Sequence, residues 1–206
     1  HLLPQHLTHL SLDLGSALQL EACIEQLCLL RLKSLTLLIG SSDSTANYVP
    51  ELLLAQTALQ TLVISGYAVF EDIERVAEAI TNMSSLTCFC LLVDIGDRGG
   101  PDYWIPIAQA LEHLPLQSLN WNARSLYDKP DHASALLTSL APTLKQLYLS
   151  HLQLPHEYVP RLHQLQKLDL TIDYMTFASL PDWLEGTTSL QQLRLSTGQY
   201  GITLTA

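Results

Sequence analysis

Basic residues are scarce in this sequence. It has 10 Lys and Arg residues against 20 Asp and Glu residues in a chain of 206, which gives a formal net charge of −10. A surface of this sign repels the phosphate backbone of nucleic acids and the anionic surface of a lipid bilayer. We therefore expect neither nucleic acid nor a membrane among the partners of this chain.

Long apolar runs are also missing, although 48% of the residues are hydrophobic. Polar residues interrupt every leucine-rich stretch before it reaches the roughly 18 residues that a membrane-spanning helix needs. The first residues, 1–6, show no basic segment followed by an apolar one, so they do not resemble a secretion signal. We expect a folded, soluble chain whose numbering starts inside a longer or processed protein.

The sequence has four cysteines, at positions 23, 28, 88 and 90. Two lie in a stretch with helical spacing and two are separated by one residue in a strand-like stretch, which is not the spacing of a disulfide framework. Cys88 and Cys90 could face a metal ion together, but no adjacent His or Cys completes a tetrahedral set of ligands. We expect free thiols, a reducing cytoplasmic compartment and no bound metal.

Motifs for catalysis and for cofactors are missing as well. The sequence contains no Gly-x-Ser-x-Gly, no Gly-x-x-x-x-Gly-Lys and no Gly-x-Gly-x-x-Gly, so the devices that position acyl groups, nucleotides and dinucleotides are lacking. His156-Glu157 begins like a zinc-protease helix, but Pro160 stands where the second His is needed and would interrupt the helix. We expect no enzyme activity, no cofactor and no small-molecule substrate.

What the sequence does contain is a phrase, Leu-x-x-Leu-x-Leu, that recurs with substitutions eight times. The spacing of its copies varies between 21 residues (147 to 168) and 30 residues (89 to 119), and their central residues are Leu10, Leu35, Leu62, Phe89, Leu119, Leu147, Leu168 and Leu193. Each copy alternates apolar and polar residues, as a half-buried strand does.

The residues that follow most copies change to the spacing of an amphipathic helix. Such stripes occupy residues 20–27, 73–80, 104–111 and 133–140. Asp131 is placed as the N-cap of the last of these helices. The sixth interval is too short for a long helix and carries prolines, so we expect only a turn or two there. Strand followed by helix is therefore the predicted repeating unit.

These repeats resemble the leucine-rich-repeat superfamily, whose period is roughly 20 to 29 residues. The long helical repeats are similar to the ribonuclease-inhibitor and F-box-associated types. The resemblance covers residues 1–206 and implies a single α/β domain: a horseshoe-shaped solenoid with a concave parallel sheet of about eight strands and convex helices. The family's Asn or Cys at the ninth position of each repeat is replaced throughout. Neither end looks like a cap, and we expect one or both caps to be missing.

If the leucines of each phrase point into the core, the residues between them lie on the concave face. Repeats two to four then present the apolar residues Leu38, Val63, Cys90 and Leu92. Repeats five to eight present Asn120, Asn122, Tyr148, Lys167, Asp169 and Arg194. An apolar centre beside a polar rim with Tyr and Arg is typical of protein interfaces, so we expect these residues to bind a protein.

An insertion at residues 96–102 accounts for the longest step between repeats. Its glycines and proline predict a protruding loop, from which Asp97 and Arg98 would also contact the partner. The alternative, with equal weight, is a solvated insertion that contacts nothing.

The resemblance implies a non-enzymatic protein-protein interaction module. The irregular repeats and the missing ninth-position Asn favour an effector that an intracellular bacterial pathogen delivers into the host cytoplasm, where it binds or inhibits a host protein or another effector. The alternative is the substrate-recognition domain of a ubiquitin ligase, of the F-box or the bacterial repeat type, whose adaptor or catalytic part lies outside this chain. An autonomous enzyme is the least favoured hypothesis.

Overall fold

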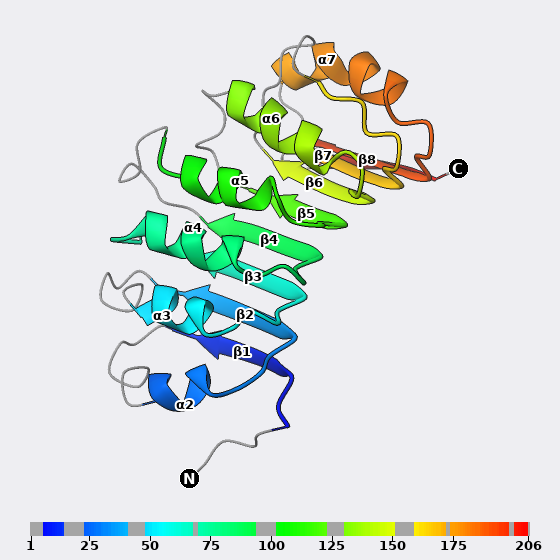
Figure 1. The fold of residues 1–206 in the computed structure, drawn as a ribbon. Helices are drawn as coiled ribbons and strands as arrows, with labels where there is room; N and C mark the ends of the chain where they lie inside the picture. The colour runs from blue at the N-terminus through cyan, green and yellow to red at the C-terminus, as the bar shows by residue number, and fades with distance from the viewer. Residues whose placement is uncertain are drawn as a thin grey trace.

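The strands of this protein lie side by side in sequence order (Figure 1). The computed structural model describes residues 6–14, 23–40, 48–67, 70–93, 102–122, 130–150, 159–171, 174–197 and 200–205. Within them, one nine-stranded sheet comprises β1 (His9–Asp13), β2 (Ser34–Ile39), β3 (Thr61–Gly66), β4 (Cys88–Val93), β5 (Ser118–Trp121), β6 (Gln146–Ser150), β7 (Lys167–Thr171), β8 (Gln192–Thr197) and β9 (Tyr200–Thr205). The eight leucine phrases form the eight strands β1 to β8, which pair in parallel as predicted.

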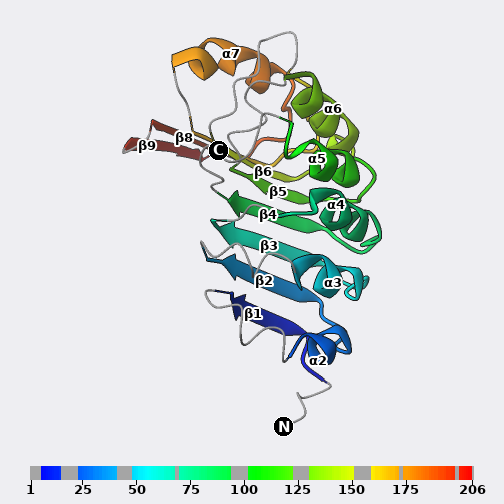
Figure 2. The same cartoon turned by 90° about the vertical axis from the view of Figure 1, so that its left-hand side faces the viewer.

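Helices alternate with the strands, and α3 to α6 stack along one side of the sheet (Figure 2). The described helices are α2 (Ile24–Cys28), α3 (Val49–Leu54), α4 (Ile73–Thr81), α5 (Ile105–Leu111), α6 (Pro130–Leu140) and α7 (Tyr174–Glu185). The predicted stripes at 73–80, 104–111 and 133–140 correspond to α4, α5 and α6. The N-cap assigned to Asp131 is wrong, because α6 already begins at Pro130. The turn expected in the sixth interval lies largely outside the described residues.

The two ends of the sheet differ. β9 runs antiparallel to β8 and covers its outer edge, which corrects the expectation of a purely parallel sheet. At the other end, no described strand pairs with the outer edge of β1. Leu10 and Leu12 of β1 are accordingly only half-buried, whereas Leu35 and Leu37 of β2 are fully buried.

Backbone hydrogen bonds link each leucine phrase to the next. The carbonyl of Lys33, which follows the first leucine of its phrase, accepts hydrogen bonds from the N–H groups of Gln60 and Thr61 at 2.8 and 3.0 Å. The same two-donor arrangement recurs at the carbonyls of Thr8, Gln60, Thr87, Gln117, Lys145 and Gln166. Because equivalent residues of successive phrases make these bonds, the phrases align in register across the parallel strands.

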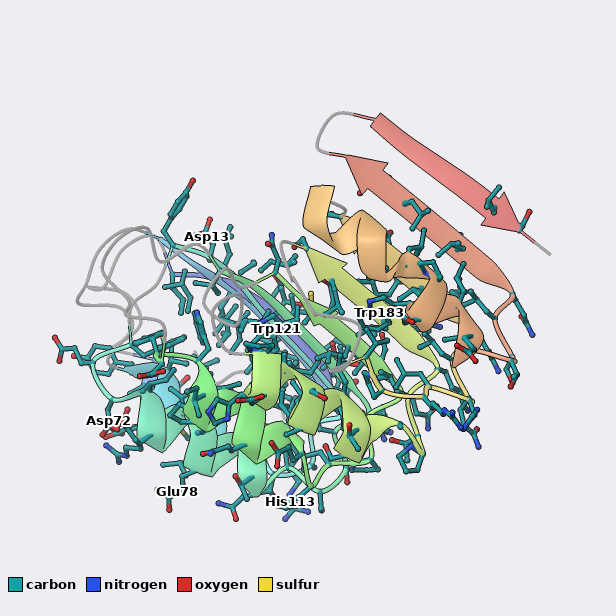
Figure 3. The ribbon with its side chains drawn as sticks, turned by 90° about the horizontal axis from the view of Figure 1, so that it is seen from above. Asp13, Asp72, Glu78, His113, Trp121 and Trp183 are labelled. Atoms are coloured by element: carbon teal, nitrogen blue, oxygen red, sulfur yellow. The ribbon has the colours of Figure 1, made fainter. Side chains whose placement is uncertain are left out.

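The core lies between the sheet and the helices. The phrase residues Leu35, Leu62 and Leu147 are fully buried, and so are the helix residues Val76, Ile107 and Leu140. Viewed from above, Trp121 and Trp183 lie in the layer between strands and helices, whereas Glu78 and His113 lie at the outer, exposed side of the helices (Figure 3). None of the described helices is long and apolar enough to cross a membrane.

One amide side chain is buried in this core and joins two repeats. Gln56, which follows α3, is 1% exposed. Its side-chain N–H group donates a hydrogen bond to the carbonyl of Leu27 at 3.1 Å, and its side-chain oxygen accepts one from the N–H group of Leu32 at 3.1 Å. Gln56 thus pairs the N–H group of Leu32 and adds a second hydrogen bond to the carbonyl of Leu27, which already accepts one from the N–H group of Leu30 at 3.2 Å.

We expect Gln56→Ala to lower the free energy of unfolding by about 1 to 3 kcal/mol, because it leaves the N–H group of Leu32 unpaired and removes one of the two hydrogen bonds to the carbonyl of Leu27. Gln60→Ala is the matched control, since the Gln60 side chain is exposed, and we expect it to change stability by less than about 0.5 kcal/mol. Equilibrium urea unfolding of both variants measures the difference. Equal stability of the two would show that the Gln56 side chain contributes nothing.

Candidate binding surface on the open face of the sheet

The face of the sheet opposite the helices, called the open face below, carries the residues between the leucines. Strand register aligns them in rows. The middle row consists of Ser11, Thr36, Val63, Cys90, Asn120, Tyr148, Asp169 and Arg194. The row nearest the strand ends consists of Asp13, Leu38, Ser65, Leu92, Ser150, Thr171 and Ser196, with Asn122 following β5. All are half-buried or exposed, so the predicted division into inward and outward residues is confirmed.

An apolar patch, consisting of Leu38, Val63, Cys90 and Leu92, occupies β2 to β4. Leu38 and Leu92 are 45% and 38% exposed and flank Ser65 in the same row. Val63 and Cys90 are half-buried direct neighbours in the middle row. Exposed apolar side chains that gather in this way, rather than singly, mark surfaces that contact other molecules.

The thiol of Cys90 contributes to this patch as an apolar group. Burial raises its pKa to about 11, and the neighbouring Cys88 acts in the same direction. The thiol is therefore protonated at neutral pH and is neither a ready nucleophile nor a ready metal ligand. All four cysteines are free. Within the described part of the chain, no group of three or more His, Cys, Asp or Glu residues could hold a metal ion.

A hollow of about 270 Å³ lies on the polar half of the open face, over β4 to β7. It is lined by Leu92, Asn120, Asn122, Tyr148, Leu149, Ser150, Asp169 and Thr171. Five predicted partner-binding residues are therefore brought together here, while Lys167 and Arg194 lie on the same face outside the lining. The sequence pattern predicted which way these side chains point, but it did not predict the hollow.

Asp169 is the acidic residue of this hollow. Its Oδ2 lies 3.7 Å from Nη1 of Arg194, whose side chain is 57% exposed. Burial raises the pKa of Asp169 above its usual value, and the charge of Arg194 lowers it by less. A charge-assisted hydrogen bond is about 2.7 to 2.9 Å long, so this ion pair is a loose one that compensates only part of the desolvation.

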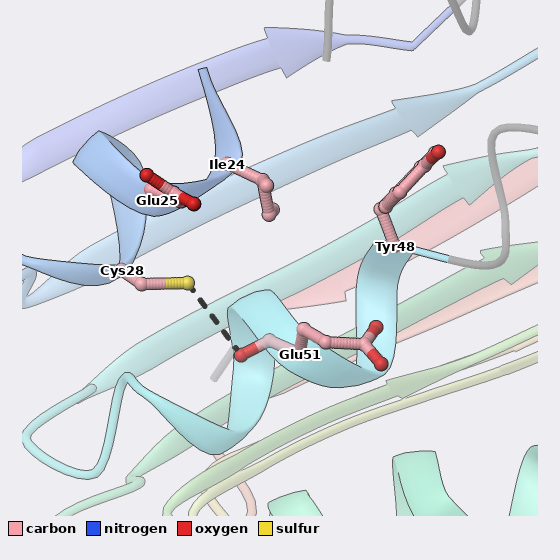
Figure 4. A pocket seen from close by; sticks show the side chains of 5 residues that line it. All are labelled: Ile24, Glu25, Cys28, Tyr48 and Glu51. Carbon is pink, nitrogen blue, oxygen red and sulfur yellow. Dashed lines mark hydrogen bonds between the residues drawn. The ribbon is translucent and has the colours of Figure 1, made fainter. Parts of the chain in front are cut away.

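A second cavity, of about 540 Å³, lies between α2 and α3 and was not predicted (Figure 4). Its lining residues are Ile24, Glu25, Cys28, Tyr48 and Glu51. The Cys28 thiol lies 3.8 Å from the backbone carbonyl oxygen of Glu51, and burial followed by the Glu51 charge raises the Cys28 pKa. Oε1 of Glu51 is bound by Nη1 of Arg75 at 2.8 Å. The Cys28 thiol is therefore protonated at neutral pH. The other carboxylate oxygen of Glu51, Oε2, is buried without a hydrogen-bond partner among the described residues.

Asp97 and Arg98, predicted to contact the partner from a loop, lie outside the described residues. Their assignment stays a prediction.

The fold and the open face together define a class: an α/β strand–helix repeat protein with one exposed sheet face. Neither a protein-family model nor a curated protein sequence matches this chain. Among solved structures, it is similar to the crystal structure of the leucine-rich repeat-containing protein LegL7 from Legionella pneumophila, with 15% identity over 97% of this chain and 86% of that chain and a TM-score of 0.35. A likeness this low carries no argument about function.

Proposed function

We propose that this chain is a protein-interaction module of the leucine-rich-repeat type, a single solenoid domain over residues 1–206 that binds a protein partner on its open face and does not act as an enzyme. One observation carries the proposal: eight adjacent strands present accessible side chains in aligned rows, with the apolar patch directly beside the hollow. Such a surface is broad and shallow, as protein interfaces are.

The composition of the surface supports a protein partner. Leu92 belongs to both the apolar patch and the lining of the hollow, so the two form one continuous area. Protein interfaces combine an apolar centre with a polar rim, and Tyr and Arg contribute a large share of their binding energy. The open face offers Tyr148 and Arg194 for that role, with Lys167 at the edge of the same half.

The titratable groups of the open face support binding rather than catalysis. A general base or nucleophile is usually tuned by a partner within hydrogen-bond reach. Burial raises the pKa of the Cys90 thiol and keeps it protonated, and the carboxylate of Asp169 forms its ion pair with Arg194, whose guanidinium group is not a general acid or base at neutral pH.

Two settings fit such a module. We propose first, on the irregular repeats, that the chain acts as a bacterial effector in the host cytoplasm, where it binds or inhibits a host protein or another effector. The alternative is the substrate-recognition part of a ubiquitin ligase. The identity of the bound protein separates these settings, while the location of the binding face is the same in both.

The test is affinity capture with the whole chain as bait, in parallel with Val63→Glu and Tyr148→Ala. Both residues are accessible on the open face. We therefore expect each change to lower the affinity for a saturably bound partner by about tenfold or more, without lowering the melting temperature. Ala135→Glu is the matched control, since Ala135 is exposed on α6, on the helical side. Its binding should equal that of the wild type.

If both open-face variants hold the partner as tightly as the wild type, the open face is not the interface. If Ala135→Glu alone releases the partner, the helical side carries the binding instead.

A further inference from the structure

The lining of the hollow on the open face has an unbalanced charge. Among the described residues, the lining contains one acidic residue, Asp169, and no Lys, Arg or His. Its other polar members are amides and hydroxyls, namely Asn120, Asn122, Tyr148, Ser150 and Thr171. Their oxygen atoms can all accept hydrogen bonds. These amides and hydroxyls can also donate, so it is the carboxylate of Asp169 that favours a positively charged ligand that donates hydrogen bonds.

The loose ion pair leaves the carboxylate of Asp169 room for another cation. Oδ2 is 3.7 Å from Arg194, beyond a direct charge-assisted hydrogen bond, and the Arg194 side chain extends largely into solvent. The Asp169 side chain is itself only 22% exposed. A carboxylate that is partly desolvated and loosely paired gains more from a second donor than a fully hydrated one would.

The apolar lining suits the hydrocarbon part of a long side chain. Leu92, which is 38% exposed, contributes apolar surface, and Tyr148 contributes an aromatic ring. Lysine and arginine place their methylene groups along apolar surface and their charge at a polar tip. An aromatic ring next to that tip attracts it further, and arginine more than lysine can stack on the ring.

The size of the hollow favours one side chain over a free ligand. Its volume of about 270 Å³ is below the roughly 300 to 1,000 Å³ that is usual for small-molecule sites. It is also open toward the apolar patch through Leu92, so a segment bound there can extend across β2 to β4.

We propose that the hollow over β4 to β7 is a pocket for the cationic side chain, arginine in preference to lysine, of an extended segment of a partner protein whose apolar residues lie on the patch of Leu38, Val63, Cys90 and Leu92. This inference rests on the proposed function, because it assigns one subsite of the same surface. Asp169 is the charge-recognising residue and Tyr148 the aromatic wall. The net charge of −10 also attracts a basic partner at long range.

The experiment is a selection from a random-peptide phage library on the immobilised whole chain. Selected peptides are synthesised, and their dissociation constants are measured by fluorescence anisotropy. Open-face binders are first identified by their loss of affinity for Val63→Glu. In these peptides we expect a recurrent arginine. Its replacement by citrulline, a neutral isostere, should weaken binding about tenfold or more, and replacement by lysine should weaken it less.

The protein variant Asp169→Asn should reproduce the effect of citrulline. In a double-mutant cycle, the two changes together should weaken binding no more than either alone, because both remove the same contact. We expect Asp169→Asn to melt at or slightly above the wild-type temperature, since burial disfavours the charged carboxylate. Glu78→Gln, on the exposed side of α4 (Figure 3), changes the net charge equally and should leave the affinity unchanged.

The remaining outcomes overturn the cationic pocket. Open-face binders that tolerate citrulline and Asp169→Asn would overturn the cationic pocket and leave the binding function standing. If Glu78→Gln lowers the peptide affinity as much as Asp169→Asn does, the effect comes from long-range charge alone. That result would also overturn the pocket. If no selected peptide depends on Val63, the open face does not bind extended segments and the cationic pocket is overturned, while the proposed function is decided separately by the capture experiment with Val63→Glu and Tyr148→Ala. The citrulline measurement uses the wild-type chain, so the test does not depend on how Asp169→Asn folds.

Discussion

Gly66→Ala is expected to lower the free energy of unfolding by roughly 3 kcal/mol or more. Gly66 ends β3 with a φ of +110°, a region that residues with a Cβ rarely adopt. A Cβ added there would lie 2.1 Å from the carbonyl oxygen of Ile39, far inside van der Waals contact. That oxygen also accepts a hydrogen bond from the N–H group of Tyr67 at 2.9 Å, so the two strands cannot separate locally without losing it.

Ser65→Ala is the control for this prediction. Ser65 is the adjacent residue of β3, and its hydroxyl makes only a long hydrogen bond, 3.4 Å, to the carbonyl of Leu37. We expect a loss below about 1 kcal/mol. Guanidinium unfolding followed by circular dichroism measures both variants. A Gly66→Ala protein as stable as Ser65→Ala would mean that β2 and β3 do not approach as closely as described.

Leu147→Ala should remove about 2 to 5 kcal/mol of stability, whereas Tyr148→Ala should remove less than about 1 kcal/mol. The two residues are neighbours in β6 but point to opposite faces: Leu147 is fully buried and Tyr148 is half-buried on the open face. Truncating Leu147 leaves a cavity between the sheet and the helices. Truncating Tyr148 removes a side chain that solvent already reaches.

Thermal and urea unfolding of these two variants, together with partner capture, distinguishes the core role of Leu147 from the binding role of Tyr148. Leu147→Ala should bind its partner normally at temperatures where it stays folded, while Tyr148→Ala should melt like the wild type and bind weakly. The reverse pattern, with Tyr148→Ala the less stable protein, would contradict the strand register of β6.

The repeat phrase was a strong predictor because it carries two kinds of information. Its alternation determines the face on which each side chain lies, and its recurrence determines which residues align across strands. Val63, Cys90 and Asn120 were therefore placed in one row from the sequence alone, and the register of β3, β4 and β5 confirms this.

Elements without the phrase were missed. β9 contains no Leu-x-x-Leu-x-Leu, and its antiparallel pairing with β8 depends on a reversal of the chain that no periodicity predicts. α7 contains Pro181 within the helix, although proline usually marks a helix boundary. Asp131 was given a capping role by its residue type, but Pro130 already occupies the first position of α6, where proline is well tolerated.

The sequence by itself determined the strand–helix repeat, the alignment of the strands and the residues on each face, because these follow from local periodicity. Only the tertiary structure decided where the open face is hollow, how loosely Arg194 pairs with Asp169, and which buried groups Gln56 satisfies. Those properties depend on side chains from different repeats, such as Leu92, Tyr148 and Asp169, and on their sizes, contacts and exposure to water. No pattern within one repeat contains that information.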